Sequence, residues 1–142
     1  MTDSECIFCR IVSGDAESTT IYEDDTVVVF LDINPVTPGH LMVVPRAHLA
    51  ALGDVDAATG AHMFNVAQRM ASTLRESGLR CEGVNLFLAD GEAAFQEVFH
   101  AHLHVFARYE GDGFQLSAHW ESRPSRSELE SIGERIRNAL SR

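Results

Sequence analysis

Three histidines occupy alternate positions of the chain, His100, His102 and His104, and only apolar residues separate them. In an extended strand, side chains alternate between two faces with a period of two, so we expect the three imidazoles to share one face. Ala101 and Leu103 would then point to the opposite face. The sequence therefore predicts a strand with one packed face and one face that carries chemistry.

The spacing of these histidines limits how they could bind a metal. A strand rises about 3.3 Å per residue, so the Cα atoms of His100 and His104 would lie about 13 Å apart, too far for both to ligate one ion without distortion. His102 and His104 could still chelate a metal as a pair. Alternatively, a neutral imidazole could attack phosphorus directly, because it is already unprotonated near pH 7. The spacing alone leaves both chemistries open.

A second group of polar residues lies in the run from Phe30 to His48. Asp32 directly follows an apolar stretch, and His40 and His48 flank the next one. A carboxylate in that position either caps a turn or holds hydroxyl groups of a ligand. Each of the two histidines taken singly is as readily structural as functional, and their joint placement with Asp32 is what indicates a site.

Periodicity and turn signals predict the elements that position these residues. We expect strands over residues 21–23, 26–31, 40–44 and 83–88, and a last strand from 100 or 101 to 107, with the first two joined as a hairpin. A long amphipathic helix is expected from 54 or 56 to 79, with an acidic N-cap and Gly78 as its stop. Its apolar stripe would consist of Ala57, Ala61, Phe64, Ala67, Ala71 and Leu74. A short helix or turn over 6–13 precedes the strands, and the capping-box spacing of Ser125 and Glu128 predicts a C-terminal helix over 125–140. Strands clustered around one long helix predict an α+β fold with a mostly antiparallel sheet.

Length and charge restrict the class of protein. The 142 residues suit a single domain over 1–142, with a core over about 6–109 and a C-terminal extension. The net charge of −10 makes nucleic acid or an anionic membrane an unfavourable partner. We expect neither a signal peptide nor a membrane span. Three cysteines, an odd number, fit a reducing, cytoplasmic compartment.

The two motifs together resemble those of the histidine triad (HIT) family. They read Asp32-Ile33-x-Pro35-x-x-x-Gly39-His40 and Gln96-x-Val98-x-His100-x-His102-x-His104. The resemblance implies an HIT-like fold, a homodimer, and a site on each subunit for a purine nucleotide or nucleotide conjugate. It further implies transfer of a nucleotidyl group to the middle histidine, which is His102 by position. The remaining implied roles are Asp32 on the ribose, Phe8, Ile11, Phe30 and Ile33 around the base, and His40, His104 and Gln96 beside the phosphate.

The N-terminal pair Cys6 and Cys9 is half of a zinc site, or else two buried thiols. Some members of the family carry a zinc whose other ligands match His48 and His100. The resemblance thus implies a structural Zn²⁺ held by two thiolates and two imidazoles. Cys81 is distant in sequence and is expected to be a separate thiol.

Three residues depart from the family pattern near the reacting atoms. Ala89 stands where a polar amide is common, Phe95 where glycine usually precedes the loop glutamine, and Glu97 where serine or threonine often approaches the leaving group. We therefore expect Glu97 to be one of the nucleotide-binding residues. We expect a nucleotide hydrolase or transferase acting on nucleoside phosphoramidates or adenylyl conjugates. The alternatives are a dinucleoside polyphosphate hydrolase, a nucleotide-binding regulatory dimer with little catalysis, and a metal enzyme using His102 and His104.

Overall fold

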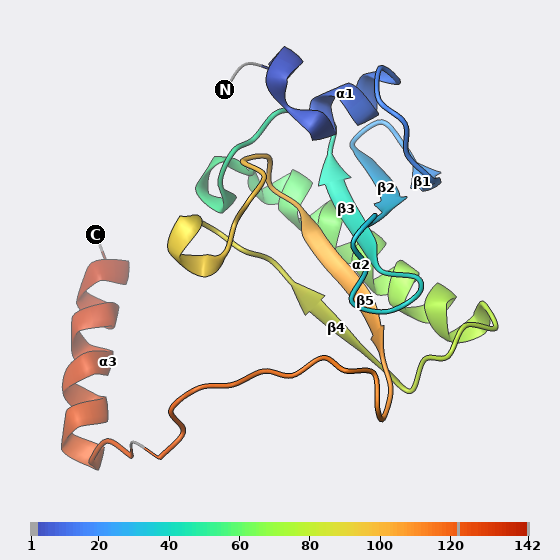
Figure 1. Cartoon of the computed structure of the whole chain (residues 1–142). Coiled ribbons are helices and arrows are strands. Elements are labelled where there is room, and N and C mark those ends of the chain that lie inside the picture. Colours follow the sequence, from blue (N-terminus) through green and yellow to red (C-terminus); the bar gives the residue numbers. More distant parts are fainter. Residues whose placement is uncertain (1–2, 122, 142) are drawn as a thin grey trace. The chain divides into compact units, whose positions relative to one another are not determined.

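The structure is a computed structural model that describes residues 3–121 and 123–141. It divides into two compact units, Met1–Asp112 and Gly113–Arg142, each described by itself. In the first unit the elements are, in order, the 3-10 helix η1 (Asp3–Glu5), α1 (Ile7–Ser13), β1 (Thr20–Glu23), β2 (Val27–Leu31), β3 (Leu41–Pro45), η2 (Leu52–Asp54), α2 (Ala57–Glu76), β4 (Gly83–Phe87), η3 (Glu92–Ala94) and β5 (Leu103–Arg108) (Figure 1). The second unit holds α3 (Arg126–Leu140).

The five strands form one antiparallel sheet in the order β1-β2-β3-β5-β4. The expected α+β fold with an antiparallel sheet is confirmed. The register places His104 opposite Met42 on β3 and opposite Phe87 on β4. His104 therefore lies on a strand that has a neighbour on each side, which limits how far its backbone can move.

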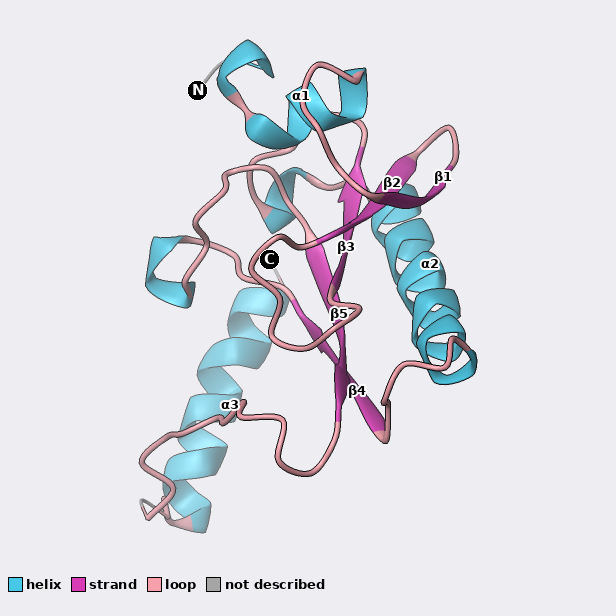
Figure 2. Ribbon diagram, turned by 45° about the vertical axis from the view of Figure 1, so that its right-hand side comes forward, coloured by secondary structure: helices cyan, strands magenta, loops and turns pink. Residues whose placement is uncertain are grey.

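Each face of the sheet packs against a different helix, with α2 along one face and α1 at the end of the other (Figure 2). Val27 and Val29 of β2 join the cluster with α2, whereas Val28 and Phe30 join the cluster with α1. Strand residues alternate between the faces with a period of two, so one short strand contributes to both cores. On β5, Leu103 and Val105 contact the α2 cluster, so the face that carries His104 is the face of α1.

The predicted stripe of α2 is wrong at Ala57, Ala61 and Phe64, which are exposed, Phe64 by 54%. The buried side of the helix is instead formed by Met63, Val66, Ala67, Met70 and Leu74. This set has the same three- and four-residue spacing, and it offers larger apolar side chains to the sheet than the alanine-rich stripe does. The N-cap is as expected, since the Asp56 side chain accepts a hydrogen bond from the Thr59 backbone N–H.

The last strand begins later than predicted, at Leu103 rather than at residue 100 or 101. The Ala101 N–H donates to the Leu49 carbonyl at 2.6 Å, outside the ladder between β3 and β5. His100 is consequently in a bend ahead of the strand. The strand alternation predicted for all three histidines therefore does not extend to His100.

The turn before β3 sets the position of His40. Gly39 has φ +93°, and a Cβ there would lie 2.8 Å from Leu79 Cδ1 and 3.0 Å from Leu74 Cδ2. Only glycine fits a left-handed turn packed this closely. The buried Thr37 hydroxyl donates to the Ala107 carbonyl at 2.7 Å and ties the same turn to β5.

The second unit contains the expected C-terminal helix. The Glu128 N–H donates to Ser125 Oγ at 3.1 Å, and the Ser125 N–H donates to the Glu128 carboxylate at 2.7 Å. This reciprocal pair is the predicted capping box. Within the described residues, no helix has the length and apolar character needed to cross a membrane.

Candidate active site and metal centre

A pocket of about 340 Å³ opens on the α1 face of the sheet. His102 and His104 line it together with Asp32 and Glu97. The residues expected around a base, Phe8, Ile11, Phe30 and Ile33, line it as well. Two motifs about sixty residues apart in sequence thus contribute to one cavity, because β3 and β5 are neighbours in the sheet.

The hydrogen bond of His102 fixes its tautomer. Its Nδ1 lies 2.7 Å from the His100 carbonyl oxygen, and a carbonyl can only accept, so Nδ1 carries the proton. The lone pair of the neutral ring is therefore on Nε2. Phe8 packs edge-on against this ring at 5.0 Å between centroids, which restricts its rotation. His102 is thereby held with an unprotonated nitrogen as its reactive atom.

A second set of hydrogen bonds fixes the tautomers of His40 and His104. The Val36 N–H donates to His40 Nδ1 at 3.0 Å, so the proton of neutral His40 is on Nε2. His40 Nε2 lies 2.8 Å from His104 Nδ1, which must accept that proton in a hydrogen bond. The proton of His104 is therefore on Nε2. His104 lines the pocket and can donate this proton to a phosphoryl oxygen there, whereas His40, expected beside the phosphate, is not among the residues that line the pocket.

Burial keeps these imidazoles neutral. It lowers the pKa of His102, and the hydrogen bond to His100 and the charge of Asp32 oppose this only in part. Burial, followed by the proximity of His102 and His40, lowers the pKa of His104 to about 4. Burial also lowers the pKa of His40 against the opposing charge of Asp32. Neutral rings near pH 7 are the condition under which the tautomers above apply.

Asp32 caps a turn and also lines the pocket. Its Oδ1 accepts the Asn34 N–H at 2.8 Å and so caps a turn. Its Oδ2 lies 3.6 Å from His40 Nε2 and 3.9 Å from His104 Nδ1, while the residue also lines the pocket. The carboxylate is thus held in place by one oxygen and faces the site with the other.

Gln96, expected beside the phosphate, does not line the pocket, but its neighbours Phe95 and Glu97 do. Oε1 accepts the Gly91 N–H at 2.8 Å, and Nε2 donates to the Ala50 and Val98 carbonyls at 2.8 and 3.2 Å. The Gln96 amide is therefore engaged with backbone on both sides of the loop. This placement suits a positioning residue for the loop backbone.

Several residues that line the pocket were not singled out from the sequence. Met42 and Phe87 lie opposite His104 on its two neighbouring strands, and Glu17 and Ser18 come from the loop after α1. The strand register would have identified the first two, but register arises from the tertiary fold. The described residues that line the pocket include the carboxylates of Glu17, Asp32 and Glu97 and no arginine, and the chain contains no lysine.

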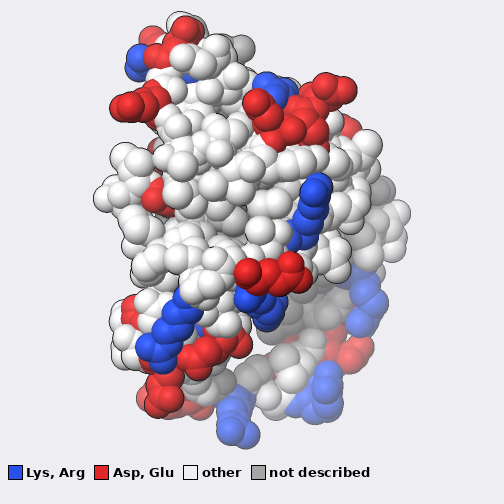
Figure 3. Space-filling view, turned by 90° about the vertical axis from the view of Figure 1, so that its right-hand side faces the viewer, with Lys and Arg blue, Asp and Glu red and all other residues white. Residues whose placement is uncertain are grey.

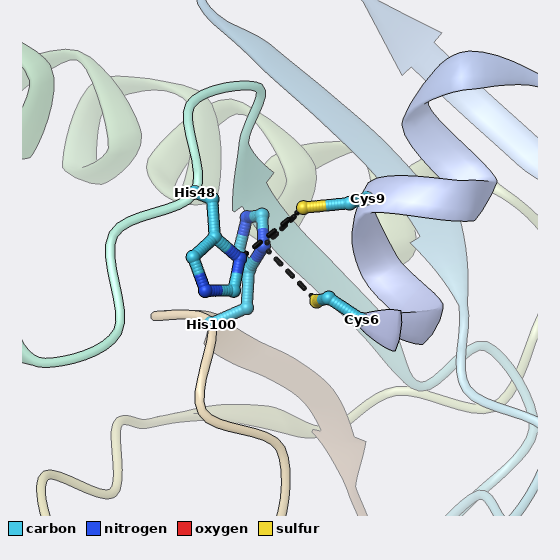
Figure 4. A group of neighbouring side chains, drawn as sticks. All are labelled: Cys6, Cys9, His48 and His100. Carbon is cyan, nitrogen blue, oxygen red and sulfur yellow. Dashed lines mark hydrogen bonds between the residues drawn. The ribbon is translucent and has the colours of Figure 1, made fainter. Parts of the chain in front are cut away.

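The second cluster brings together Cys6, Cys9, His48 and His100 (Figure 4). Cys9 Sγ lies 3.2 Å from His48 Nδ1, and each of the two sulfurs lies 3.5 Å from His100 Nδ1. A tetrahedral Zn²⁺ with Zn–S of about 2.3 Å and Zn–N of about 2.0 Å places such ligands about 3.5 Å apart. His100 Nε2 lies 2.7 Å from the Pro45 carbonyl and so carries the proton, which leaves the lone pair on Nδ1. The donor set and the tautomer both fit zinc.

Asp32, His40 and His104 also converge, but they fit a metal poorly. A cation on His40 would need a lone pair on Nε2, which moves the proton to Nδ1, against the Val36 N–H. His104 Nδ1 in turn is occupied by the hydrogen bond from His40. The same hydrogen bond opposes chelation by His102 and His104 through that nitrogen, so the geometry does not support the metal-enzyme alternative.

Known proteins resemble this chain in sequence and in fold. A zinc-bound histidine triad family protein from Mycobacterium smegmatis is 42% identical, with 97% of this chain and 99% of that chain covered and a TM-score of 0.77. A histidine triad nucleotide-binding protein from Candida albicans is 25% identical, with 96% and 98% covered and a TM-score of 0.83. An uncharacterized HIT-like protein of Borreliella burgdorferi is 40% identical, over 78% of this chain and 80% of its own length. Adenylylsulfatase HINT3 of Arabidopsis thaliana is 30% identical, over 77% of this chain and 55% of its own length. The HIT domain model matches residues 13–111, and the chain belongs to the HIT family.

Proposed function

We propose that this protein is a nucleotide hydrolase or transferase that acts at the α-phosphorus of nucleoside phosphoramidates or adenylyl conjugates through a nucleotidyl-His102 intermediate. The observation that carries the proposal is the tautomer of His102, whose Nδ1 proton is held by the His100 carbonyl so that Nε2 is free to attack. The related adenylylsulfatase and nucleotide-binding protein support the substrate class.

In the first step, the lone pair of His102 Nε2 forms a bond to phosphorus while the bond from phosphorus to the leaving group breaks. The leaving group takes that electron pair and a proton from solvent. The ring becomes cationic and keeps its Nδ1 proton on the His100 carbonyl, which stabilises the charge. His104 Nε2–H, fixed by His40, donates to a phosphoryl oxygen, and loss of one donor of this kind costs about 3 kcal/mol of barrier in other enzymes.

In the second step, water attacks phosphorus and the bond to His102 Nε2 breaks. The electron pair returns to the ring, which becomes neutral again. The proton that water loses balances the proton that the leaving group took. The products are the nucleoside monophosphate and the free leaving group, and His102 regains its starting tautomer.

The nucleoside would bind at the apolar end of the pocket. Phe8 and Phe30 meet edge-on at 5.4 Å between centroids, and Ile11 and Ile33 complete the apolar lining. The Oδ2 oxygen of Asp32 would accept hydrogen bonds from ribose hydroxyls, since its Oδ1 is already occupied by the Asn34 N–H. Of these residues only Phe8 packs against the His102 ring, so monophosphate binding should largely survive removal of His102.

Glu97 and the lining charges favour an amine over a polyphosphate as leaving group. A polyphosphate would bring several negative charges beside Glu97, and two like charges 4 Å apart at an effective dielectric of about 20 repel by about 4 kcal/mol. A departing amine carries no such charge. Dinucleoside polyphosphate hydrolysis is therefore the weaker candidate, and turnover of matched substrates distinguishes the two.

A structural Zn²⁺ would be held by Cys6, Cys9, His48 and His100. With four protein ligands it would have no open coordination position. It would instead link α1 to His100, whose carbonyl oxygen accepts the hydrogen bond from His102 Nδ1. The chemistry at phosphorus is assigned to His102 and His104 alone.

The partner assignments follow from charge and from the family. On the face drawn in Figure 3, acidic and basic side chains are interspersed and much of the surface carries neither charge. Together with the net charge of −10, this opposes binding to a nucleic-acid backbone. The homodimer implied by the family stays a prediction, which sedimentation of the purified chain tests.

Single-turnover trapping tests the proposed function. The protein is mixed with a nucleoside phosphoramidate labelled at the α-phosphorus and quenched, and acid-labile label on His102 is expected by mass spectrometry. His102→Ala should abolish label and turnover while changing the monophosphate Kd by less than about threefold. His119→Ala, outside the pocket lining, is the control. Label that persists in His102→Ala would overturn the assignment.

A further inference from the structure

Phe95 ends η3 in a left-handed backbone conformation that bulky residues rarely adopt, with its N–H donating to the Glu92 carbonyl at 2.9 Å. Its φ is +72°, and within the described residues it is the only one other than glycine with a positive φ. Its side chain is 80% exposed yet lines the pocket. A bulky residue in the left-handed region is strained, and such strain is typical of functional sites. Glycine would adopt this turn freely, so an aromatic ring here calls for a reason in what the ring contacts.

The aromatic rings of the site run in a row through the histidines. Phe8 lies 5.0 Å from His102 between centroids, His102 lies 4.8 Å from His104, and His104 lies 6.0 Å from Phe87. Phe8 is buried, whereas Phe87 is 39% exposed. The reacting histidines therefore lie between a buried aromatic end and an exposed aromatic end, and Phe95 lines the same pocket as both.

These two ends suit the two parts of a nucleotide conjugate. The buried end suits the nucleoside, as proposed above. The part that departs from phosphorus must leave toward solvent, where the exposed rings are. We propose that Phe95 and Phe87 form a subsite for an aromatic group on the leaving amine, so that the preferred substrates are nucleoside phosphoramidates of arylalkylamines.

The charge of the loop agrees with this subsite. Glu97 is two residues after Phe95 and also lines the pocket, so a leaving group that combines an apolar ring with an uncharged or protonated nitrogen meets no like charge. Stacking on an exposed ring supplies binding that a small alkylamine cannot obtain. The subsite rests on the proposed nucleotidyl transfer and adds the identity of the leaving group.

Two substrates with one nucleoside test the subsite, a phosphoramidate of phenylethylamine and one of n-butylamine. We expect the parent to prefer the aryl substrate in kcat/KM, and Phe95→Gly to reduce that preference about fivefold to tenfold. Phe95→Tyr should retain it, and Phe87→Leu should reduce it. Phe99→Ala is the matched control, because Phe99 is a 38% exposed phenylalanine near this loop that does not line the pocket.

The outcomes separate the subsite from the proposed function. Phe95→Gly should unfold at no lower temperature than the parent, since glycine relieves the strained backbone. If both substrates turn over in Phe95→Gly with the ratio of the parent, the subsite is wrong and the proposed function stands. If the parent turns over neither substrate and gives no label on His102, both are wrong.

Discussion

The Nε2 atom of His40 lies 2.8 Å from Nδ1 of His104. Through this contact, the backbone amide that binds His40 also determines the tautomer of His104 in the pocket. The Val36 N–H fixes the proton of His40 on Nε2, and His40 then fixes the proton of His104 on the nitrogen that faces substrate. In the proposed mechanism, His40 is a positioning residue that would act on phosphate through His104.

Replacement of His40 should affect kcat more than KM. His40→Ala removes the donor to His104 Nδ1 and lets that ring change tautomer, so we expect kcat to fall about tenfold to a hundredfold while KM changes less than about threefold. His40→Gln retains an N–H donor and should recover part of the loss. Steady-state kinetics and the ¹⁵N shifts of the His104 ring check this. A large rise in KM with unchanged kcat would instead place His40 in substrate binding.

Stability should fall in mild acid because of His104. Its folded pKa is lowered to about 4 from 6.5, so below 6.5 the unfolded state binds the proton more readily than the folded state does. The contribution of this group to stability is therefore full above pH 6.5 and decreases as the pH falls toward 4. Urea unfolding across this range measures it. His104→Gln should show a flatter profile than the parent, and an equal slope in both proteins would contradict the assignment.

The sequence predicted the fold class and brought the two motifs to one pocket, but it placed some strand ends and helix faces wrongly. His102, directly before β5, and His104 within it both face the pocket, as their alternation with Leu103 and Val105 predicts. His100 departs from that face because a bend, stabilised by the contact of Ala101 with Leu49, precedes the strand. Such a contact between distant segments leaves no periodic signal.

The remaining differences have the same origin. Whether Met63 or Phe64 faces the sheet depends on the rotation of α2 about its own axis. That rotation is set by how the helix packs on the side chains of the sheet. Phe87 becomes part of the pocket through its register with His104, and register is set when the strands pair.

Metal content should separate the two clusters of histidines. We expect one zinc per chain, and we expect it to survive in His102→Ala, because Cys6, Cys9, His48 and His100 would supply all four ligands. Cys6→Ser should lose the metal and lower the unfolding temperature. Cys81→Ser is the matched control for loss of a thiol. Zinc that is lost from His102→Ala but retained in Cys6→Ser would move the metal to the pocket.

Asp24 should stabilise the fold far more than its neighbour Asp25. Its carboxylate accepts hydrogen bonds from the Thr26 and Val27 backbone N–H groups at 2.8 and 2.9 Å, and from the Tyr22 hydroxyl at 2.8 Å. His62 Nε2, on α2, lies 2.7 Å from the same carboxylate, so the hairpin of β1 and β2 is joined to the helix. Burial alone would raise the pKa of Asp24, but these hydrogen bonds outweigh it and hold the pKa well below its usual range.

Asp24→Ala should therefore lower the free energy of unfolding by about 2 kcal/mol near pH 7, since the bonds to this charged group are lost. Asp25→Ala, an exposed carboxylate in the same turn, should change it by less than about 0.5 kcal/mol. A folded pKa that is lowered gives stability that is present above the unfolded pKa of about 3.9 and is lost as the pH falls below it. The difference between the parent and Asp24→Ala should therefore narrow in urea unfolding below about pH 4. Equal losses in the two alanine variants would show that the turn, and not this hydrogen-bonded carboxylate, stabilises the junction of hairpin and helix.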